Sequence, residues 1–489
     1  MTNLSKSMLM RGIQCPKSLW LYKHQKDLIT PPDEMQQALF DQGTMVGKWA
    51  QKKYPNGTEI PFSLSPFSKK FSRTQELIQN NCPAIYEGTF QYDGSLCMVD
   101  ILHRTAEGWD LIEVKSGTSE KEHILYDIAI QYYICIGSGL KVNRVRLMHI
   151  NNQYIRDKSI DLDGLFIEVD ITEKVMARQD EIHQIKSKLK NVVSQSGEPQ
   201  IQIGPQCSTP YDCDFKAHCW KHIPDNSVFK LAGRKLEDKF QLYYEGYTTV
   251  SDIPDDYNVT DKERQQIVAE KTGKDIIDIS KIQAFLDQIY YPLYYLDFES
   301  FQSPVPPFPQ TKPYQQIPFQ YSIHILNSPF DILSHKEFLG IEGKDPRKKL
   351  AEGLIKDIPD HACIVVYNKQ FEQSIIQQLA DLYPDLEEGL LARSQNIIDL
   401  MVPFKDRAIY KPEMKGSYSI KATLPALVPT LSYDHLEINH GGLATTAYAK
   451  LSQINDASKK TKIKTQLLEY CKQDTLAMVE LVKALQSYC

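Results

Sequence analysis

The sequence has no long apolar run, and this absence limits the class of protein it can encode. Across 489 residues no stretch approaches the roughly 20 uncharged apolar residues that a membrane-spanning helix requires. The amino-terminal stretch MTNLSKSMLMRG also lacks the apolar core and the cleavage site of a secretory signal peptide. We therefore expect a cytoplasmic protein with no membrane partner.

The sequence also has little net charge. Its 56 lysine and arginine residues nearly balance 62 aspartate and glutamate residues, which leaves a formal charge of -6. This excludes a histone-like protein that binds through its overall charge, but it is compatible with an enzyme that carries a local basic groove. No Gly-rich phosphate loop of the Walker type is present, so we do not expect the chain to hydrolyse nucleotides for unwinding.

The length and an apolar content of 42% suffice for two or three packed domains. Ten cysteines in a cytoplasmic chain of this length do not indicate a disulfide framework. Cys207, Cys213 and Cys219 recur at C-x5-C-x5-C among short polar residues, and Cys15 precedes an expected helix. Four thiolates suit zinc or an iron-sulfur cluster, and His218 or His222 could replace Cys15 if the metal is zinc.

The stretch YPLYYLDFES, residues 291–300, predicts a buried strand that ends in two acids. Asp297 and Glu299 are two residues apart, so their side chains lie on the same face of that strand. Two carboxylates about 5 Å apart repel each other by about 3 kcal/mol at an effective dielectric of about 20. A protein relieves this repulsion by binding a divalent cation or by sharing a proton between the two acids, and of these we expect bound magnesium or manganese.

Three later stretches accompany this strand: VVYNKQFEQSII, NIIDLM and EYCKQDTLAMVEL. The first places Glu372 directly after an Asn-x-x-Phe pattern. The last places Tyr470 one helical turn before Asp474, so that both side chains face the same side.

Together these motifs resemble the DnaQ-like exonucleases of the DEDD class, which have a ribonuclease-H-like fold. The resemblance implies that Asp297, Glu299, Glu372 and Asp474 hold two metal ions and that Tyr470 positions the attacking water, as in the DEDDy subclass. One departure is Glu372, since the family usually has Asp at this position.

A second acidic pattern lies in the amino-terminal half. The stretch YEGTFQYDGSLCMVDILHR predicts a hairpin that turns at Asp93-Gly94, and WDLIEVKSG predicts the next strand. Glu113 and Lys115 share one face of that strand, and Asp100 on its neighbour can reach the same metal. Lys115 would orient a water molecule or stabilise charge on a phosphate.

This second pattern resembles the PD-(D/E)XK nucleases of the RecB type. The resemblance implies catalytic roles for Asp100, Glu113 and Lys115, places Gln131 in the family's fourth motif, and offers Glu87 as an additional metal ligand. Two positions depart from the family: Cys135 replaces a usual Tyr, and residues 43–50 lack the usual early His. The flanking cysteines resemble those of iron-sulfur RecB-like nucleases, which implies that they bind a [4Fe-4S] cluster.

Three other segments carry expectations of their own. Residues 223–289 predict a helical connector that resembles a helix-hairpin-helix unit. The Pro-rich residues 303–314 predict a long loop beside the carboxy-terminal site. Residues 404–421 interleave cations with aromatic rings, a pattern that suits a single nucleic-acid strand. The cations are Lys405, Arg407, Lys411, Lys415 and Lys421.

The order of these pieces resembles a bacterial family that fuses an iron-sulfur RecB-like nuclease to a DnaQ-like exonuclease. We expect an α/β protein with a restriction-endonuclease-like domain at 1–222, the connector at 223–289, and a ribonuclease-H-like mixed sheet with flanking helices at 290–489. The implied function is a metal-dependent nuclease with two sites, one a 3′-5′ exonuclease, in DNA repair or defence.

The alternatives are a nucleic-acid-binding scaffold with decayed sites and an RNA-processing exonuclease. The implied partner is nucleic acid, with DNA favoured over RNA, together with a separate helicase or defence-system protein as a further candidate.

Overall fold

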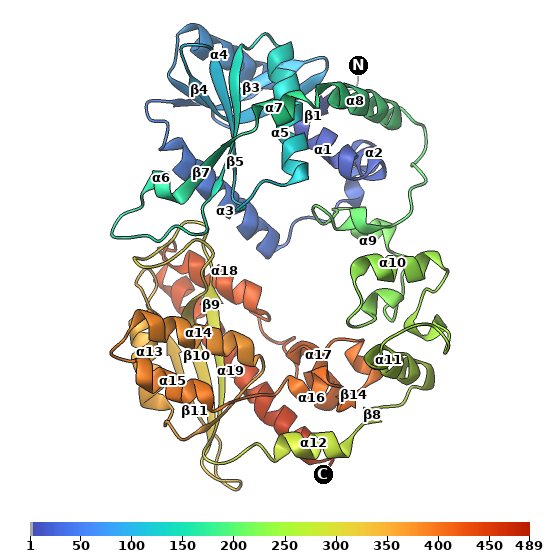
Figure 1. Cartoon of the computed structure of the whole chain (residues 1–489), viewed down its shortest axis with the longest axis vertical. Helices are drawn as coiled ribbons and strands as arrows, with labels where there is room; N and C mark the ends of the chain where they lie inside the picture. Colours follow the sequence, from blue (N-terminus) through green and yellow to red (C-terminus); the bar gives the residue numbers. More distant parts are fainter. Residues whose placement is uncertain (1–2) are drawn as a thin grey trace. The chain divides into compact units, whose positions relative to one another are not determined.

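A computed structural model describes residues 3–489, and the chain divides into two compact units (Figure 1). The first unit comprises the chain up to His222 together with Ser303–Gln315. The second comprises Ile223–Gln302 and Gln316–Cys489. Both units are mixed α/β structures, in agreement with the expected class. Within residues 3–489, no helix is both long and apolar enough to span a membrane.

The first unit is organised around a sheet of order β2-β3-β4-β5-β6-β7, with β1 paired in parallel to β4. Strands β3, β4 and β5 form an antiparallel meander, and β5 and β6 are parallel, with a helix between them in the chain. The strands are β1 (Leu4–Ser5), β2 (Thr58–Glu59), β3 (Ala84–Tyr92), β4 (Ser95–Arg104), β5 (Trp109–Lys115), β6 (Val142–Ile150) and β7 (Phe166–Asp170). The predicted hairpin is confirmed, since Asp93 and Gly94 both adopt positive φ between β3 and β4.

Helix α5 lies in the core of this unit because nearly all its faces are apolar, which is typical of a buried helix. Cys15 precedes α2 as its N-cap, as the sequence predicted, and Pro16 is the first residue of the helix, a position that tolerates proline. The helices are α1 (Lys6–Gln14), α2 (Pro16–His24), α3 (Glu34–Gln51), α4 (Phe67–Gln79), α5 (Glu122–Gly137), α6 (Leu162–Leu165), α7 (Thr172–Met176), α8 (Gln179–Val193) and α9 (Lys216–Cys219).

The second unit contains a five-stranded sheet of order β11-β10-β9-β12-β13. Its central strand β9 is antiparallel to β10 and parallel to β12. The strands are β9 (Leu293–Phe301), β10 (Ile317–Leu326), β11 (Ser334–Leu339), β12 (Cys363–Val366) and β13 (Ile397–Asp399). Alternate β9 residues Tyr294, Leu296 and Phe298 pack in a core with α13 (Arg347–Asp357), α14 (Lys369–Leu382) and α15 (Glu387–Gln395). The intervening residues of β9 therefore face the opposite side.

The remaining helices complete this unit. They are α10 (Leu236–Tyr244), α11 (Asp261–Thr272), α12 (Ile279–Leu286), α13 (Arg347–Asp357), α14 (Lys369–Leu382), α15 (Glu387–Gln395), α16 (Val402–Lys405), α17 (Ile420–Leu427), α18 (Gly441–Leu451) and α19 (Ala457–Gln486).

The expected connector differs from the prediction in one respect. Residues 223–289 are largely helical, but they belong to the second unit and contribute a strand, β8 (Ile276–Ile277). This strand pairs antiparallel with β14 (Ile409–Tyr410). Ile276 and Ile277 therefore form backbone pairs with a strand more than 130 residues away, which helical periodicity does not predict.

The Pro-rich loop was placed wrongly by the sequence. Residues 303–315 pack in the first unit, where Val305 joins the core beneath the sheet. Arg156 donates to the carbonyl oxygens of Pro306 and Pro307 at 2.9 and 2.6 Å, and the Tyr314 hydroxyl donates to the Ser116 carbonyl. Because this proline-rich segment cannot form a regular ladder, its carbonyl groups are satisfied by a side chain from elsewhere.

Candidate functional site

Two elements of the second unit bring three carboxylates together. Strand β9 places Asp297 and Glu299 on the face opposite the α13–α15 core, and helix α19 supplies Asp474. One oxygen from each of these acids lies within 4.8 Å of the others. The acids that the sequence predicted on the strand and on the last helix thus lie in one cluster.

Glu372 joins this cluster from the first turn of α14, whose N-cap is Asn368. Its side chain is 2% exposed, and burial together with the charges of Asp297 and Glu299 holds its pKa well above the usual range. Among the described residues, its Oε2 atom has no hydrogen-bond partner. A buried oxygen in this state is costly unless a proton or a cation satisfies it.

Burial raises the pKa values of all four carboxylates. Burial, followed by the charge of Asp474, raises the pKa of Asp297, and burial followed by the charge of Asp297 raises that of Glu299. Burial raises the pKa of Asp474 only to about 6, because a tyrosine hydroxyl and a lysine oppose it. Such a group of acids is stabilised by protons or by divalent cations, and their oxygens are the ligands that Mg²⁺ and Mn²⁺ prefer.

Three further residues lie beside this cluster and were not assigned to it from the sequence. The Tyr433 hydroxyl donates to Asp474 Oδ1 at 2.6 Å, and Cys471 Sγ lies 3.6 Å from Asp297 Oδ2. The Lys421 ammonium lies 5.4 Å from the ring centres of both Tyr433 and Tyr470. Cys471 could have been found as the neighbour of Tyr470, but Tyr433 lies in a loop with no motif. Tyr470 itself is buried beside Asp474, as predicted.

The structure corrects the predicted basic surface at 404–421 at Arg407 and Tyr410, whereas Lys405, Lys415 and Lys421 are exposed. Arg407 is 3% exposed and stacks 4.1 Å above the ring of Tyr410, which is itself fully buried, so neither can stack on a nucleic-acid base. Lys411 pairs with Asp275 at 2.9 Å and Lys415 with Asp225 at 3.3 Å. Their charges serve contacts within the second unit, whereas Lys421 lies at the acidic cluster and Lys405 is exposed.

The first unit brings together most of the second predicted set. Glu113 accepts hydrogen bonds from Lys115 and from Gln131, each at 2.6 Å. Asp100 on β4 accepts the backbone N–H of Val114 at 2.8 Å. Burial, followed by the charge of Glu113, raises the pKa of Asp100 to about 8. Cys135 lies apart from these groups, buried against Cys97.

The acid side of this site opens into a cavity of about 470 Å³. Glu87, Asp100 and Lys115 line it together with the 43–51 part of α3. Glu87 adopts a left-handed φ of 59°, which is uncommon for a residue with a Cβ, and burial raises its pKa. Three of the positions that the sequence offered for a metal or its water, Glu87, Asp100 and Lys115, thus face one space, whereas Glu113 is not among the described residues that line it.

Sequence reasoning missed two charged residues here. Asp127, one helical turn before Gln131 on α5, pairs with Lys115 at 2.7 Å. Lys6 from α1 pairs with Asp127 at 3.0 Å and with Glu113 at 3.3 Å. Although burial opposes it, the charges of Lys6 and Lys115 lower the pKa of Asp127. The i, i+4 spacing from Gln131 could have identified Asp127. No local pattern could have identified Lys6, because it lies 107 residues from Glu113 in the sequence.

The four predicted thiols meet in the first unit. Cys15, Cys207, Cys213 and Cys219 line one small cavity of about 20 Å³. Burial raises the pKa of Cys219 to about 11, and the neighbouring thiols contribute to the shift. His218, considered as a replacement for Cys15, instead lies 3.5 Å from Glu198.

The described residues define a mixed α/β protein with a buried carboxylate cluster in its second unit. Residues 294–419 match the model of a family described as a domain of unknown function, DUF2779. The match includes Asp297, Glu299 and Glu372 and ends before Asp474.

The curated relatives are distant. An uncharacterized protein of Ureaplasma parvum, UU173, is 25% identical over 250 residues, which are 42% of this chain and 36% of that protein. An uncharacterized MG366 homolog of Mycoplasma pneumoniae is 26% identical over 213 residues, 38% of this chain and 31% of its own length. The similarity therefore spans about a third of each of these relatives.

Proposed function

We propose that the second unit is a metal-dependent 3′-5′ exonuclease site. The observation that carries this proposal is the meeting of Asp297, Glu299, Glu372 and Asp474, contributed by β9, α14 and α19. These acids would hold Mg²⁺ or Mn²⁺, which when bound would activate water and stabilise the leaving oxygen. The unpartnered Glu372 oxygen fits such an ion set.

The sheet supports this proposal. Its order β11-β10-β9-β12-β13, with two antiparallel pairs followed by two parallel pairs, resembles the ribonuclease-H-like arrangement. In that arrangement the first strand carries the first two acids, as β9 does here.

The chain's own residues would perform the remaining steps. Tyr470 would donate a hydrogen bond to the attacking water and fix its direction. Tyr433 would hold Asp474 in one orientation through the 2.6 Å hydrogen bond, and Lys421 would attract the phosphate beside the carboxylates. The products would be 5′-mononucleotides from a free 3′ end.

The test is incubation of the pure protein with labelled single-stranded and duplex DNA and RNA, in magnesium, in manganese and in EDTA. Cleavage that requires the divalent cation supports the proposal, and the preferred substrate decides between DNA and RNA. Binding without cleavage of any substrate under all three conditions would instead identify a scaffold with decayed sites.

The first unit supports a second nuclease site. The β3-β4-β5 meander followed by α5 and the parallel β6 resembles the PD-(D/E)XK core. Glu87, Asp100 and Glu113 would hold a cation, and Lys115 would contact the scissile phosphate or the water. Gln131 would fix the Glu113 carboxylate through its 2.6 Å hydrogen bond.

The thiol cavity supports a structural cofactor in the first unit. Cys15, Cys207, Cys213 and Cys219 would hold a [4Fe-4S] cluster, which would link α2 to the 207–219 segment. Anaerobically purified protein should be brown, with broad absorption near ~400 nm. A colourless protein with one equivalent of zinc would favour the alternative metal.

A further inference from the structure

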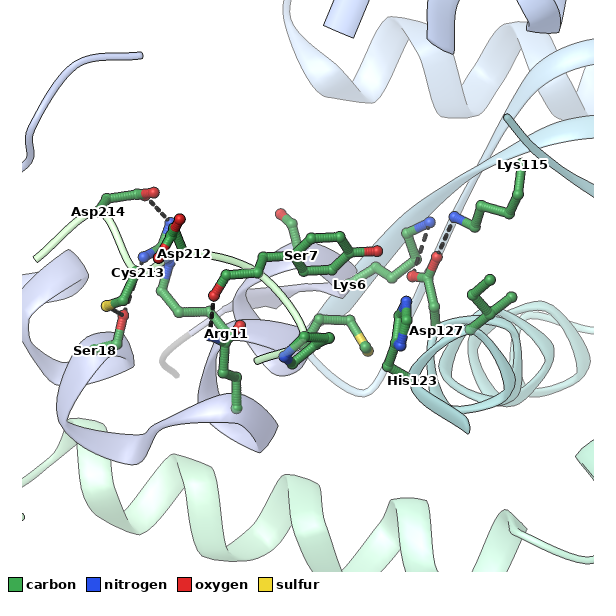
Figure 2. Close-up of a pocket in the computed structure, with 15 residues that line it drawn as sticks. Lys6, Ser7, Arg11, Ser18, Lys115, His123, Asp127, Asp212, Cys213 and Asp214 are labelled. Carbon is green, nitrogen blue, oxygen red and sulfur yellow. Dashed lines mark hydrogen bonds and ion pairs between the residues drawn. The ribbon is translucent and has the colours of Figure 1, made fainter. Parts of the chain in front are cut away.

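A cavity of about 340 Å³ lies in the first unit beside Lys115. Its lining comes from α1, α2, the end of β5, the start of α5 and residues 210–214 (Figure 2). The volume is within the range of small-ligand pockets, about 300–1,000 Å³. This cavity is separate from the one that Glu87 and Asp100 line, and Lys115 contributes to both.

Two lysines share one carboxylate at its wall. Figure 2 shows Lys6 and Lys115 both directed at Asp127, with Nζ–Oδ distances of 3.0 and 2.7 Å. Their second common partner, Glu113, is not among the described residues that line the cavity. At this part of the wall two ammonium groups therefore face one carboxylate. Asp212 and Asp214 also line the cavity, and they pair with Lys216 at 3.0 Å and with Arg11 at 2.5 Å.

These cations retain donors for a ligand. An ammonium carries three N–H donors, and within residues 3–489 the ion pairs of each lysine are with Asp127 and Glu113, at 2.6 to 3.3 Å. Arg11 donates to Ser18 at 3.1 Å and to Asp214 at 2.5 Å, which uses two of its five donors. Each of these groups can therefore donate a hydrogen bond to a further oxygen without losing the contacts that orient it.

The cavity also has an aromatic side. The rings of His123 and Tyr211 meet edge to face with centres 5.2 Å apart, and Tyr211 is 59% exposed. Burial, followed by the charges of Lys121 and Lys115, lowers the pKa of His123, and the charge of Asp127 opposes this shift. Cations beside exposed rings are the combination that holds a single nucleic-acid strand.

We propose that this cavity binds a backbone phosphate of a single nucleic-acid strand, with Lys6 and Arg11 as the donors and Tyr211 beside the adjoining base. The inference rests on the nuclease function proposed for the first unit, since a phosphate held here lies next to Lys115. Such a contact positions the strand and carries no sequence preference. Lys6 is thereby a substrate-binding residue that neither nuclease motif contains.

Binding of a fluorescent oligothymidylate to the full chain in EDTA tests this without cleavage. Lys6→Gln should weaken binding about 10-fold, because it removes a charge-assisted hydrogen bond. It should also make the slope of log affinity against log salt shallower by about 0.7. Lys53→Gln is the matched control, since Lys53 is also 22% exposed and also pairs with two carboxylates, Asp163 and Glu168. Equal effects of the two changes would overturn the proposal.

A second measurement locates the strand even if Lys6→Gln fails to fold. An oligonucleotide carrying 5-iodouracil should crosslink to Tyr211 or His123 on irradiation, and Tyr211→Ala should reduce the yield. Inorganic phosphate and thymidine 5′-monophosphate should compete. If they bind the cavity while the strand crosslinks elsewhere, the ligand is a free phosphate compound and the strand proposal is wrong.

The two proposals fail separately. If the protein cleaves in a metal-dependent way and Lys6→Gln binds the strand as the parent does, the phosphate-site proposal is wrong and the nuclease proposal stands. If Lys6→Gln weakens binding but the parent protein cleaves no substrate, the phosphate-site proposal stands and the nuclease proposal is wrong.

Discussion

The hydroxyl of Tyr433 lies 2.6 Å from Oδ1 of Asp474, although the two residues are 41 positions apart and on different elements. The hydrogen bond stabilises the ionised carboxylate, and with Lys421 it opposes the effect of burial on the pKa of Asp474. It also fixes one oxygen of Asp474 and so directs the other. Tyr433 is therefore a positioning residue for the acidic cluster.

Tyr433→Phe removes this hydrogen bond and little else. We expect a loss of exonuclease rate of about 10- to 100-fold, with the acidic limb of the pH-rate profile moved to higher pH. The rate should recover in part at higher pH, where Asp474 ionises without help. A uniform loss at every pH, or no loss, would contradict the positioning role.

The metal-free protein should lose stability as pH rises. The pKa values of Asp297, Glu299, Glu372 and Asp474 are raised in the folded state, so the folded protein binds more protons than the unfolded chain once the pH exceeds about 4. The free energy of unfolding then falls through pH 6, the approximate pKa of Asp474, and beyond it for the other three acids.

Thermal melts in EDTA from pH 5 to 8 measure this trend, with pH values chosen to bracket about 6. Manganese should restore more stability at the higher pH, where the acids must otherwise ionise unpaired. Asp297→Asn should flatten the pH dependence. His324 and His335, whose pKa values are lowered to about 3 and about 4, add stability as the pH rises, so the comparison with Asp297→Asn is decisive. The same pH dependence in the parent and in Asp297→Asn would show that the cluster is not strained by its charges.

Removing a thiol that lines the cavity should reduce cofactor binding, whereas removing a thiol elsewhere should not. Cys213→Ala should lower the bound iron or zinc and the melting temperature of the first unit, since it removes one of the four thiols that line the cavity. Cys82→Ala is the control, because Cys82 is partly buried but lies outside that lining. Equal metal content in both variants and the parent would exclude this site.

Lys421 and Lys405 should behave differently, although the sequence assigned both to one surface. Lys421→Ala removes the cation that faces Asp474 and Glu299 and should raise KM about 10-fold for a single-stranded substrate. Lys405→Ala should leave KM close to that of the parent, because Lys405 is an exposed residue at the end of α16. Similar KM values for the two variants would instead support the basic surface that the sequence predicted, which includes both lysines.

Local periodicity predicted the parts of each site that one element supplies. The two-residue period of β9 placed Asp297 and Glu299 on one face, and the helical period of α19 placed Tyr470 beside Asp474. Lys6 and Tyr433 escaped prediction because they reach their partners across 107 and 41 residues, through packing that no local pattern encodes.

Composition misled where burial decides the role of a charge. Arg407 and Tyr410 carry the residue types of a nucleic-acid surface, yet their stacked pair is buried within the second unit. The Pro-rich residues 303–314 were expected to form a loop beside the carboxy-terminal site, but their carbonyl groups accept hydrogen bonds from Arg156 in the first unit. In both cases the partner lies far away in sequence, so only the folded chain identifies it.

The central claim is that Asp297 serves an exonuclease separate from the Asp100 site. The most direct test uses Asp100→Ala protein with manganese and a 5′-labelled single strand whose 3′ end is free or blocked. We predict stepwise release of 5′-mononucleotides from the free 3′ end only, abolished by adding Asp297→Ala. Normal trimming of the blocked strand, or trimming that survives Asp297→Ala, would contradict the account.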